Sequence, residues 1–372
     1  MSSFRVLLPF VLSCLTLTLR LSAQTAAAKP EPDVLIFTNG DKLVGHFVGS
    51  TGGTITFKSD MLGDVHVDWS KIKELRSSTK FAVIRKGVKI RHKDESGVPQ
   101  GPVAVADQKI EVAATPPQSV PVGDAAYVVN QDAFNKAVMQ SPGFFKAWTG
   151  TVTAGASLVQ ATQDSRTFTG AISLIRAVPT EQWLNPSNRT TVNFTASYGT
   201  ISQPATATIK TSIYHGDAEQ DKYFSPRVFA FGQAAFDHNF SQGLDLQQTY
   251  GGGIGWTVLK SANQTLDLKA STIYINQQFE AGPNQSLIGS TFAELYMRKL
   301  VHGMILNEKL SATPAWNNTN AYSWNVGAGL AVPVFNRFSA SINAIDNFLN
   351  DPPPGFKKNS FQFTLGLTYA LQ

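Results

Sequence analysis

The feature that most constrains this chain is a period-two alternation of apolar and small polar residues in its second half. The clearest example is AYSWNVGAGLAVPVF, residues 321–335, which contains no charge. In an extended strand, such alternation places the apolar set on one face and the serine–glycine set on the other. A soluble sandwich would turn the apolar set toward a core, whereas a membrane barrel would turn it toward lipid.

About twelve segments of this kind follow Trp148. They run 11 to 16 residues, longer than the ~5 to 6 typical of soluble strands and enough for the ~9 to 11 of a tilted membrane strand. The sequence therefore predicts an all-β protein whose residues 147–372 form a ~12-stranded antiparallel transmembrane β-barrel. The predicted strands are 147–160, 166–178, 189–201, 205–215, 223–237, 244–259, 264–278, 286–300, 303–316, 321–334, 336–348 and 357–371.

An even strand number places both ends of the barrel on one side. Under this count the short links 261–263, 302–303 and 336–337 fall on that side, and 351–358 falls on the other. The link 178–187 is longer than this arrangement predicts.

Two sets of side chains are expected to mark the membrane. Trp and Tyr near the segment ends predict an interfacial aromatic girdle, and charges on the polar face of the strands predict a hydrated lumen. A charge that faces lipid at mid-depth costs ~2 to 4 kcal/mol. The candidate girdle is Trp148, Tyr198, Trp256, Tyr322, Trp324 and Tyr369, and the candidate lumen-facing residues are Lys210, Asp267, Lys269, Glu294 and Arg298. We expect Glu294 and Arg298 to pair with Lys269 or Asp267.

Residues 1–23 have the features of a secretory signal peptide, with a positive Arg5, an apolar run over 6–19 and small residues around Ala23. An uncleaved anchor and lipidation at Cys14 are the alternatives. Cys14 is the single cysteine, so a chain cleaved after Ala23 has no disulfide and no thiolate metal site. The sequence predicts export.

The segment after the signal has a different composition. Residues 29–146 carry 15 basic and 13 acidic residues in 118, whereas 147–372 carry 14 and 13 in 226. Short strands around the turn Asn39-Gly40 predict a small SH3-like β domain over 29–128, followed by a linker with a short helix over 129–146. The net charge of +5 is spread along the chain, which argues against a nucleic-acid partner.

The residues that could carry chemistry do not converge. The six histidines show no metal-ligand spacing, and none supplies the His–Ser pair, two residues apart, of the outer-membrane phospholipase. The glycines of YGGGIGW (250–256) lie within an alternating strand, where they relieve crowding. Asp217, Glu219 and Asp221 are expected in a connection, either as a solvated turn or as oxygen ligands of a cation. We predict no enzymatic activity, cofactor or metal.

Several phrases together carry a family resemblance: DVLIFTNGDKLVGHFVG and DMLGDVHVDWSKIKEL near the start, then FDHNFSQGLDLQQTYGGGIGW, LIGSTFAELYMRKL and FKKNSFQFTLGLTYALQ. In this order they resemble the salt-stress-induced outer membrane protein family. The resemblance implies an outer-membrane barrel with a periplasmic β module and brings no catalytic residues. The chain departs from the aromatic C-terminal residue common in such barrels, since it ends at Gln372.

The sequence thus predicts a non-enzymatic protein in the outer membrane of a Gram-negative bacterium, with its N-terminal domain in the periplasm. Its predicted partners are outer-membrane lipid, the barrel-assembly machinery, and peptidoglycan or a periplasmic protein, with no nucleic acid. A narrow pore for ions or small solutes and an envelope-structural role both fit. The alternatives are a plugged barrel whose periplasmic module binds a partner, a membrane-embedded hydrolase, and a soluble exported β-sandwich.

Overall fold

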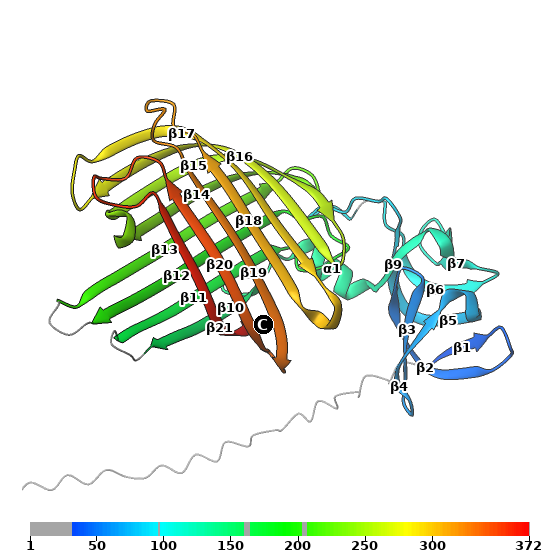
Figure 1. Ribbon diagram of the computed structural model, residues 1–372. Coiled ribbons are helices and arrows are strands. Elements are labelled where there is room, and N and C mark those ends of the chain that lie inside the picture. The colour runs from blue at the N-terminus through cyan, green and yellow to red at the C-terminus, as the bar shows by residue number, and fades with distance from the viewer. Residues whose placement is uncertain (1–31, 96, 160–163, 203–206, 372) are drawn as a thin grey trace, which may run out of the picture. The chain divides into compact units, whose positions relative to one another are not determined.

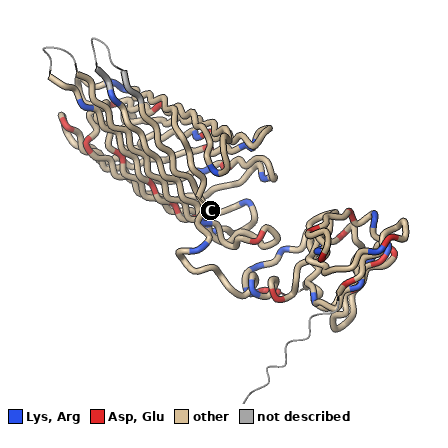
Figure 2. Tube along the Cα trace, turned by 90° about the horizontal axis from the view of Figure 1, so that it is seen from below, with Lys and Arg blue, Asp and Glu red and all other residues tan. Residues whose placement is uncertain are grey.

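The computed structural model describes residues 32–95, 97–159, 164–202 and 207–371, so the predicted signal segment lies outside the described residues. The chain forms two compact units (Figure 1): the described parts of 1–81 and 100–128, and those of 82–99 and 129–372. The boundary falls within a strand: residues 82–99, which the sequence assigned to the N-terminal domain, group with the second unit, although 82–85 end a strand of the first unit's sheet. Charged residues crowd on the first unit and are sparse along the barrel strands (Figure 2).

The first unit is a nine-stranded sheet with the strand order β4-β3-β2-β1-β5-β6-β7-β8, and β9 pairs with β2 and β5. The β1–β2 hairpin turns at Gly40, whose φ of +92° suits glycine. One face of the strands forms the core, where Leu35, Ile55 and Phe57 are fully buried. The strands are β1 (Asp33–Phe37), β2 (Lys42–Thr51), β3 (Thr54–Ser59), β4 (Gly63–Asp68), β5 (Ile72–Arg85), β6 (Gln100–Ala106), β7 (Lys109–Val112), β8 (Gln118–Pro121) and β9 (Ala125–Asn130), with 3-10 turns η1 (Trp69–Lys71) and η2 (Val122–Asp124).

The second unit is built on a closed antiparallel barrel of twelve strands, as predicted. The barrel closes where β21 pairs with β10, with Gly150 opposite Leu371. The strands are β10 (Trp148–Val159), β11 (Asp164–Val178), β12 (Asn188–Ser202), β13 (Ile209–Tyr223), β14 (Val228–Asn239), β15 (Leu244–Lys260), β16 (Gln264–Phe279), β17 (Gln285–Lys299), β18 (Ile305–Thr313), β19 (Ser323–Phe335), β20 (Phe338–Leu349) and β21 (Asn359–Leu371).

One strand differs from its predicted bounds in a way that changes the interpretation. The fourth barrel strand, β13, extends to Tyr223, whereas the sequence ended it at 215 and placed Asp217, Glu219 and Asp221 in a connection. That prediction was wrong. The three carboxylates occupy every second position, so they lie on one face of the strand. This face points into the barrel, whose interior accepts charged side chains that the core of a soluble protein would exclude.

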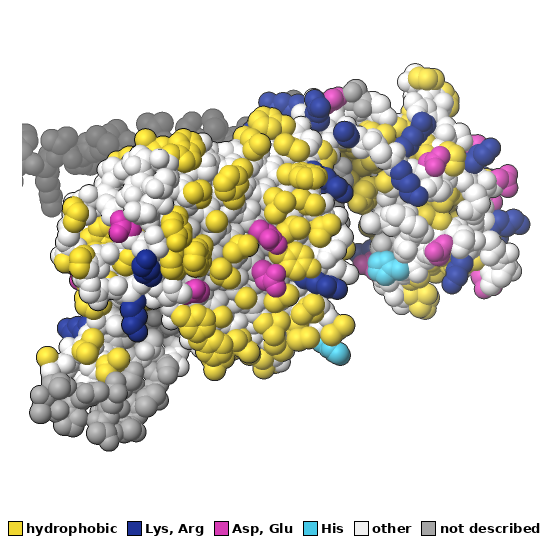
Figure 3. All heavy atoms as spheres, turned by 45° about the horizontal axis from the view of Figure 1, so that its top comes forward, with side chains coloured by type: hydrophobic (Ala, Val, Ile, Leu, Met, Phe, Trp, Pro, Cys, Tyr) yellow, Lys and Arg dark blue, Asp and Glu magenta, His cyan; other side chains and the backbone are white. Residues whose placement is uncertain are grey.

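The outer face of the barrel is apolar. On β21, Phe363 and Leu365 are 60% and 58% exposed, and hydrophobic side chains spread over the barrel face seen in Figure 3. Trp324 and Val326 also lie outside, so the serine–glycine set of the 321–335 stretch faces inward. A closed barrel with an apolar outer face is the architecture of a transmembrane β-barrel.

No helix in the described part of the chain is long and apolar enough to cross a membrane.

The two ends of the barrel differ in their links. We call the end where β10 begins and β21 ends the terminal rim, and the opposite end the distal rim. The short links 261–263, 300–304 and 336–337 lie at the terminal rim and the link 350–358 lies at the distal rim, in agreement with the predicted sides.

The long β11–β12 link, 179–187, is a packing platform within the second unit. The predicted helix, α1 (Gln131–Met139), begins at Asn130, whose side chain accepts hydrogen bonds from the N–H groups of Asp132 and Ala133. Fully buried Phe134 of this helix stacks on Trp183 of the link, with ring centroids 5.2 Å apart. The link is long because it forms an apolar contact with α1.

Candidate functional site

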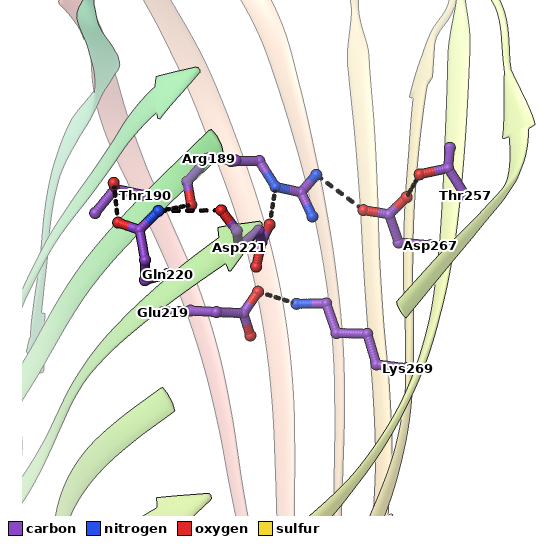
Figure 4. Close-up of polar contacts among 8 residues, drawn as sticks. All are labelled: Arg189, Thr190, Glu219, Gln220, Asp221, Thr257, Asp267 and Lys269. Carbon is purple, nitrogen blue, oxygen red and sulfur yellow. Dashed lines mark hydrogen bonds and ion pairs between the residues drawn. The ribbon is translucent and has the colours of Figure 1, made fainter. Parts of the chain in front are cut away.

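The polar side chains of the barrel gather on its inner wall. Near the terminal rim, Arg189 on β12 donates from Nε to Asp221 on β13 (2.5 Å) and from Nη1 to Asp267 on β16 (2.9 Å). Asp267 also accepts a hydrogen bond from Thr257 Oγ1 at 2.7 Å (Figure 4). Since β12 and β16 are four strands apart in a ring of twelve, the Arg189–Asp267 ion pair crosses the interior.

A second ion pair lies beside the first. Lys269 on β16 bonds Glu219 on β13, again across the intervening strands (Figure 4). Two inward phenylalanines pack against these cations: the Arg189 guanidinium lies 5.0 Å from the Phe229 ring, and the Lys269 ammonium lies 5.2 Å from the Phe231 ring. These contacts fill part of the interior near the terminal rim.

Gly255 makes room for this packing. A Cβ added at this position would lie 2.2 Å from the Phe229 ring, so a larger residue requires the ring to move. The glycine therefore relieves crowding, as the sequence predicted for YGGGIGW.

A histidine held by two carboxylates lies further toward the distal rim. His215 Nδ1 is 2.6 Å from Asp237 Oδ1, and its Nε2 is 2.8 Å from Asp217 Oδ1. Ionised carboxylates only accept hydrogen bonds, so this geometry matches a doubly protonated imidazolium. The contacts continue along the wall from β11 to β16: Ser173 to Asn193 (2.7 Å), Asn193 to Asp217 (2.9 Å), Gln247 to Asp237 (3.1 Å) and Gln277 to Gln247 (2.7 Å).

The facing wall is mostly uncharged. Some of its inward side chains bond one another, as Thr153 does with Thr368 (2.8 Å) and Asn325 does with Asn347, and others are apolar, as Leu287 is, which packs with Ile273 and Ile275 of β16. Lys309 on β18 is the exception, and among the described residues it forms no ion pair. It is opposite Leu295 and Gly327 on the inward side of the sheet, so one cation faces the barrel interior.

The five candidate lumen residues divide between the two faces. Asp267 and Lys269 lie on the inner face, although they pair with Arg189 and Glu219 rather than with Glu294 and Arg298.

The prediction fails for the other three. Glu294 pairs with Leu268 and Leu310, which are 41% and 47% exposed on the outer face. Arg298 lies four residues along the same face, and Lys210 shares the outer face of β13 with exposed Tyr214. Arg298 and Lys210 lie within two residues of a strand end, where the cost of a charge near lipid falls toward zero.

The six candidate girdle residues lie on the outer face near strand ends, three at each rim. Trp148, Trp256 and Tyr369 are near the terminal rim, and Tyr198, Tyr322 and Trp324 are near the distal rim. Two levels of aromatic side chains are what the two interfaces of a bilayer favour.

Sequence reasoning missed most of the interior cluster. Arg189, His215, Glu219, Asp221 and Asp237 come together only when β12 to β16 curve into a wall. The available signal was the spacing of 215, 217, 219 and 221, which is two residues throughout and therefore places one polar set on one face.

The fold also brings a serine and a histidine together on the outer face. Ser212 Oγ lies 2.9 Å from His238 Nε2, and His238 Nδ1 lies 2.7 Å from the carbonyl oxygen of Asp245. The Asp245 carboxylate is 3.9 Å away, beyond hydrogen-bond distance. Among the described residues, His238 therefore has no hydrogen-bonded carboxylate to orient it toward Ser212. We infer no hydrolytic role from this pair.

Metal binding has no support in the described part of the chain, where no group of three or more His, Cys, Asp or Glu side chains has a metal-binding arrangement. The carboxylates of β13 are held instead by Arg189, Lys269 and His215.

Comparison with solved structures finds other barrels at low identity. The NanC porin is 7% identical over 60% of this chain and 100% of its own, with a TM-score of 0.36. The COG4313 outer membrane channel from Pseudomonas putida F1 is 11% identical over 62% and 99%, with a TM-score of 0.35. The KdgM porin, solved in complex with disordered oligogalacturonate, is 8% identical over 60% and 99%, with a TM-score of 0.32.

Sequence comparisons place the chain in a family. No curated protein matches the sequence. A family model matches residues 152–371, from β10 to the last residue of β21. The match covers more than half of the chain and nearly the whole barrel, and the chain therefore belongs to the family described as "Protein of unknown function, DUF481".

Proposed function

We propose that this protein is a non-enzymatic outer-membrane β-barrel that passes ions or small polar solutes through its interior. The proposal places the first unit in the periplasm of a Gram-negative bacterium. There the first unit is available to peptidoglycan or a periplasmic partner, and the barrel contacts outer-membrane lipid after insertion by the barrel-assembly machinery. The relation to salt stress implied by the sequence resemblance stays a prediction.

The observation that carries the proposal is the contrast between the two faces of the barrel wall. The inner face carries hydrogen-bonded polar side chains from Arg189 at the terminal rim to Gln277 near the distal rim, interspersed with apolar side chains such as Phe231 and Ile273. The outer face is mostly apolar over the same strands. A polar lining is costly to bury without water, and it suits a hydrated path between the charged and the neutral wall.

The experiment is single-channel conductance of the refolded full chain in a planar bilayer, after heat-modifiable gel mobility has shown that the barrel is folded. We expect discrete conductance steps. Lys309→Glu replaces an inward cation without an ion-pair partner by an anion, so the preference for cations over anions should rise. Arg298→Glu makes the same change on the outer face and serves as the matched control.

A closed structural barrel is the second candidate, favoured by contacts across the distal rim. Gln242, in the 3-10 turn η3 (Phe240–Gln242) of the β14–β15 link, donates to the carbonyl oxygens of Asn347 (3.1 Å) and Lys358 (2.6 Å). Asn347 lies in β20 and Lys358 directly precedes β21, and these strands are five or six places from β14 and β15 in the ring of twelve. The contact therefore spans the mouth.

Silence from a folded barrel would support this second candidate over conduction. Gln242→Ala then distinguishes a mouth held shut by these contacts, which should begin to conduct, from an interior that is filled along its length, which should stay silent.

A further inference from the structure

Basic side chains collect at one end of the barrel. Lys146 precedes β10. Lys222 is near the end of β13, Arg227 is in the link between β13 and β14, and Lys260 ends β15. Arg298 and Lys299 end β17. We call these six exposed residues the basic collar. All of them are at the terminal rim, and Figure 2 shows the Lys and Arg residues around the C-terminus of the barrel.

The charge at this rim is predominantly basic. The five links there (179–187, 224–227, 261–263, 300–304 and 336–337) contain a single acidic residue, Glu181. Three more carboxylates lie within three residues of this rim: Asp221 and Asp267 are buried and paired with Arg189, and Glu308 is exposed on the outer face of β18. The distal rim is mixed by contrast, because the described links there carry Glu280 and Asp351 as well as Lys357 and Lys358.

Two exposed phenylalanines lie beside the collar. Phe145 and Phe144 are 91% and 63% exposed immediately before β10. The segment that carries them is held in place: Trp148 Nε1 donates to the Phe144 carbonyl at 2.8 Å, and Arg176 donates to the carbonyls of Lys146 (3.0 Å) and Pro142 (2.8 Å). These rings continue the outer aromatic level of Trp148, so they extend a surface that already faces lipid.

We propose that the terminal rim docks into an anionic phospholipid leaflet, with the basic collar binding lipid phosphates and Phe144 and Phe145 inserted at the interface. Cations near a membrane surface attract anionic headgroups, and amphipathic or aromatic side chains settle at the headgroup level. The collar is spread along the rim from β10 to β17 rather than gathered in one groove, with Lys222 and Arg298 on the outer side of their strands and Lys260 and Lys299 on the inner side, and this spread fits the lipid annulus. The inference rests on the membrane-spanning position of the barrel and not on conduction.

The test is lipid selectivity of the full chain refolded in vesicles of equal parts phosphatidylcholine and phosphatidylglycerol. Spin-labelled lipids report which headgroup the barrel immobilises. We expect a preference for phosphatidylglycerol that weakens with salt. In the triple variant Lys222→Gln, Arg227→Gln, Lys260→Gln, the preference for phosphatidylglycerol should fall at least about fivefold. The loss of one cation near an anionic surface alone weakens binding by about fivefold.

The matched control removes three cations at the distal rim: Arg166→Gln, Lys210→Gln, Lys357→Gln. It should keep the preference. Equal loss in both variants, or no preference in the folded wild type, overturns the proposal and leaves the collar as a surface for a protein or another polymer. Conductance measured on the same samples separates this failure from a failure of the channel proposal.

A depth measurement tests the aromatic part independently. In a Cys14→Ser background, Phe145→Cys carries a nitroxide label in the same vesicles. Accessibility to oxygen above that to a water-soluble nickel complex places the residue in the interface, and the reverse order overturns its insertion. Labelled Ser141→Cys, exposed but polar and four residues earlier, is the control expected in water.

Discussion

In the first unit the apolar side chains of the strands point into a protein core, whereas in the barrel most of them point outward from the wall. Leu35, Ile55 and Phe57 are fully buried in the first unit, whereas Phe363 and Leu365 of the barrel are 60% and 58% exposed. Both sets occupy alternate positions of β-strands. Alternation of apolar and polar residues therefore identifies a strand with two different faces. Whether the apolar face points into a core or toward lipid depends on the surroundings of the sheet.

The largest expected effect tests the apolar inside of the first unit. Phe57→Ala removes a fully buried ring and should destabilise this unit by about 3–5 kcal/mol, through lost transfer free energy and a cavity. Hydrogen exchange with mass spectrometry on the full chain reports on β3 and on the barrel strands separately. Phe363→Ala on the outer face of β21 is the control, and a matching loss of protection there would break the comparison.

The next effect tests the polar inside of the barrel. Arg189→Met leaves the buried carboxylates of Asp221 and Asp267 without their cation, which should cost about 3–5 kcal/mol of unfolding free energy. Urea unfolding of the barrel in vesicles measures it. Combining Arg189→Met with Asp221→Leu and Asp267→Leu should recover most of the loss, because no buried charge is then unpaired.

A pair of arginine substitutions sharpens the contrast between the two faces of one strand. Leu365→Arg, at the middle of β21 on the outer face, should cost about 2–4 kcal/mol. Thr364→Arg, one residue earlier, places the same charge on the inner face and should cost much less. Unfolding in vesicles compares the two variants, and equal costs would mean that the outer face of β21 does not meet lipid.

The smallest expected effect is on the pKa of Asp68, on the solvent-exposed surface of the first unit. Asp68 accepts a hydrogen bond from the backbone N–H of Ser70 (2.8 Å), and hydrogen bonding to Ser70 lowers the pKa of this carboxyl. Because the pKa is lower in the folded state, the ionised carboxylate stabilises the fold at every pH above the ordinary pKa of aspartate. This contribution is lost as the pH falls through the folded-state pKa. Ser70→Ala should raise the Asp68 pKa toward its ordinary value. NMR titration of the side chain measures the change, and an unchanged pKa would assign the shift to the backbone hydrogen bond alone.

The errors in the sequence-based placement all concern charged residues in barrel strands. Asp217, Glu219 and Asp221 resembled a solvated connection because dense charge is rare inside soluble proteins. Glu294 and Arg298 were assigned to the lumen because charge was treated as a marker of the inner face at every depth. In the structure, most inward charges have a partner, as Arg189 and Lys269 do, whereas of the three outward charges Lys210 and Arg298 lie near strand ends and Glu294 lies further along its strand.

The amino-acid sequence by itself determined the all-β class, the twelve barrel strands, the sides of the short links and the apolar face of the clearest strands. These follow from period two and from turn residues, which are local properties. Only the tertiary structure decided that Arg189 meets Asp267, that His215 lies between Asp217 and Asp237, and that the link 179–187 receives α1. These contacts join residues 22 to 78 positions apart in the sequence, except for the contact between His215 and Asp217, which are two residues apart on one strand. No local pattern in the sequence encodes the closure of the sheet that brings the others together.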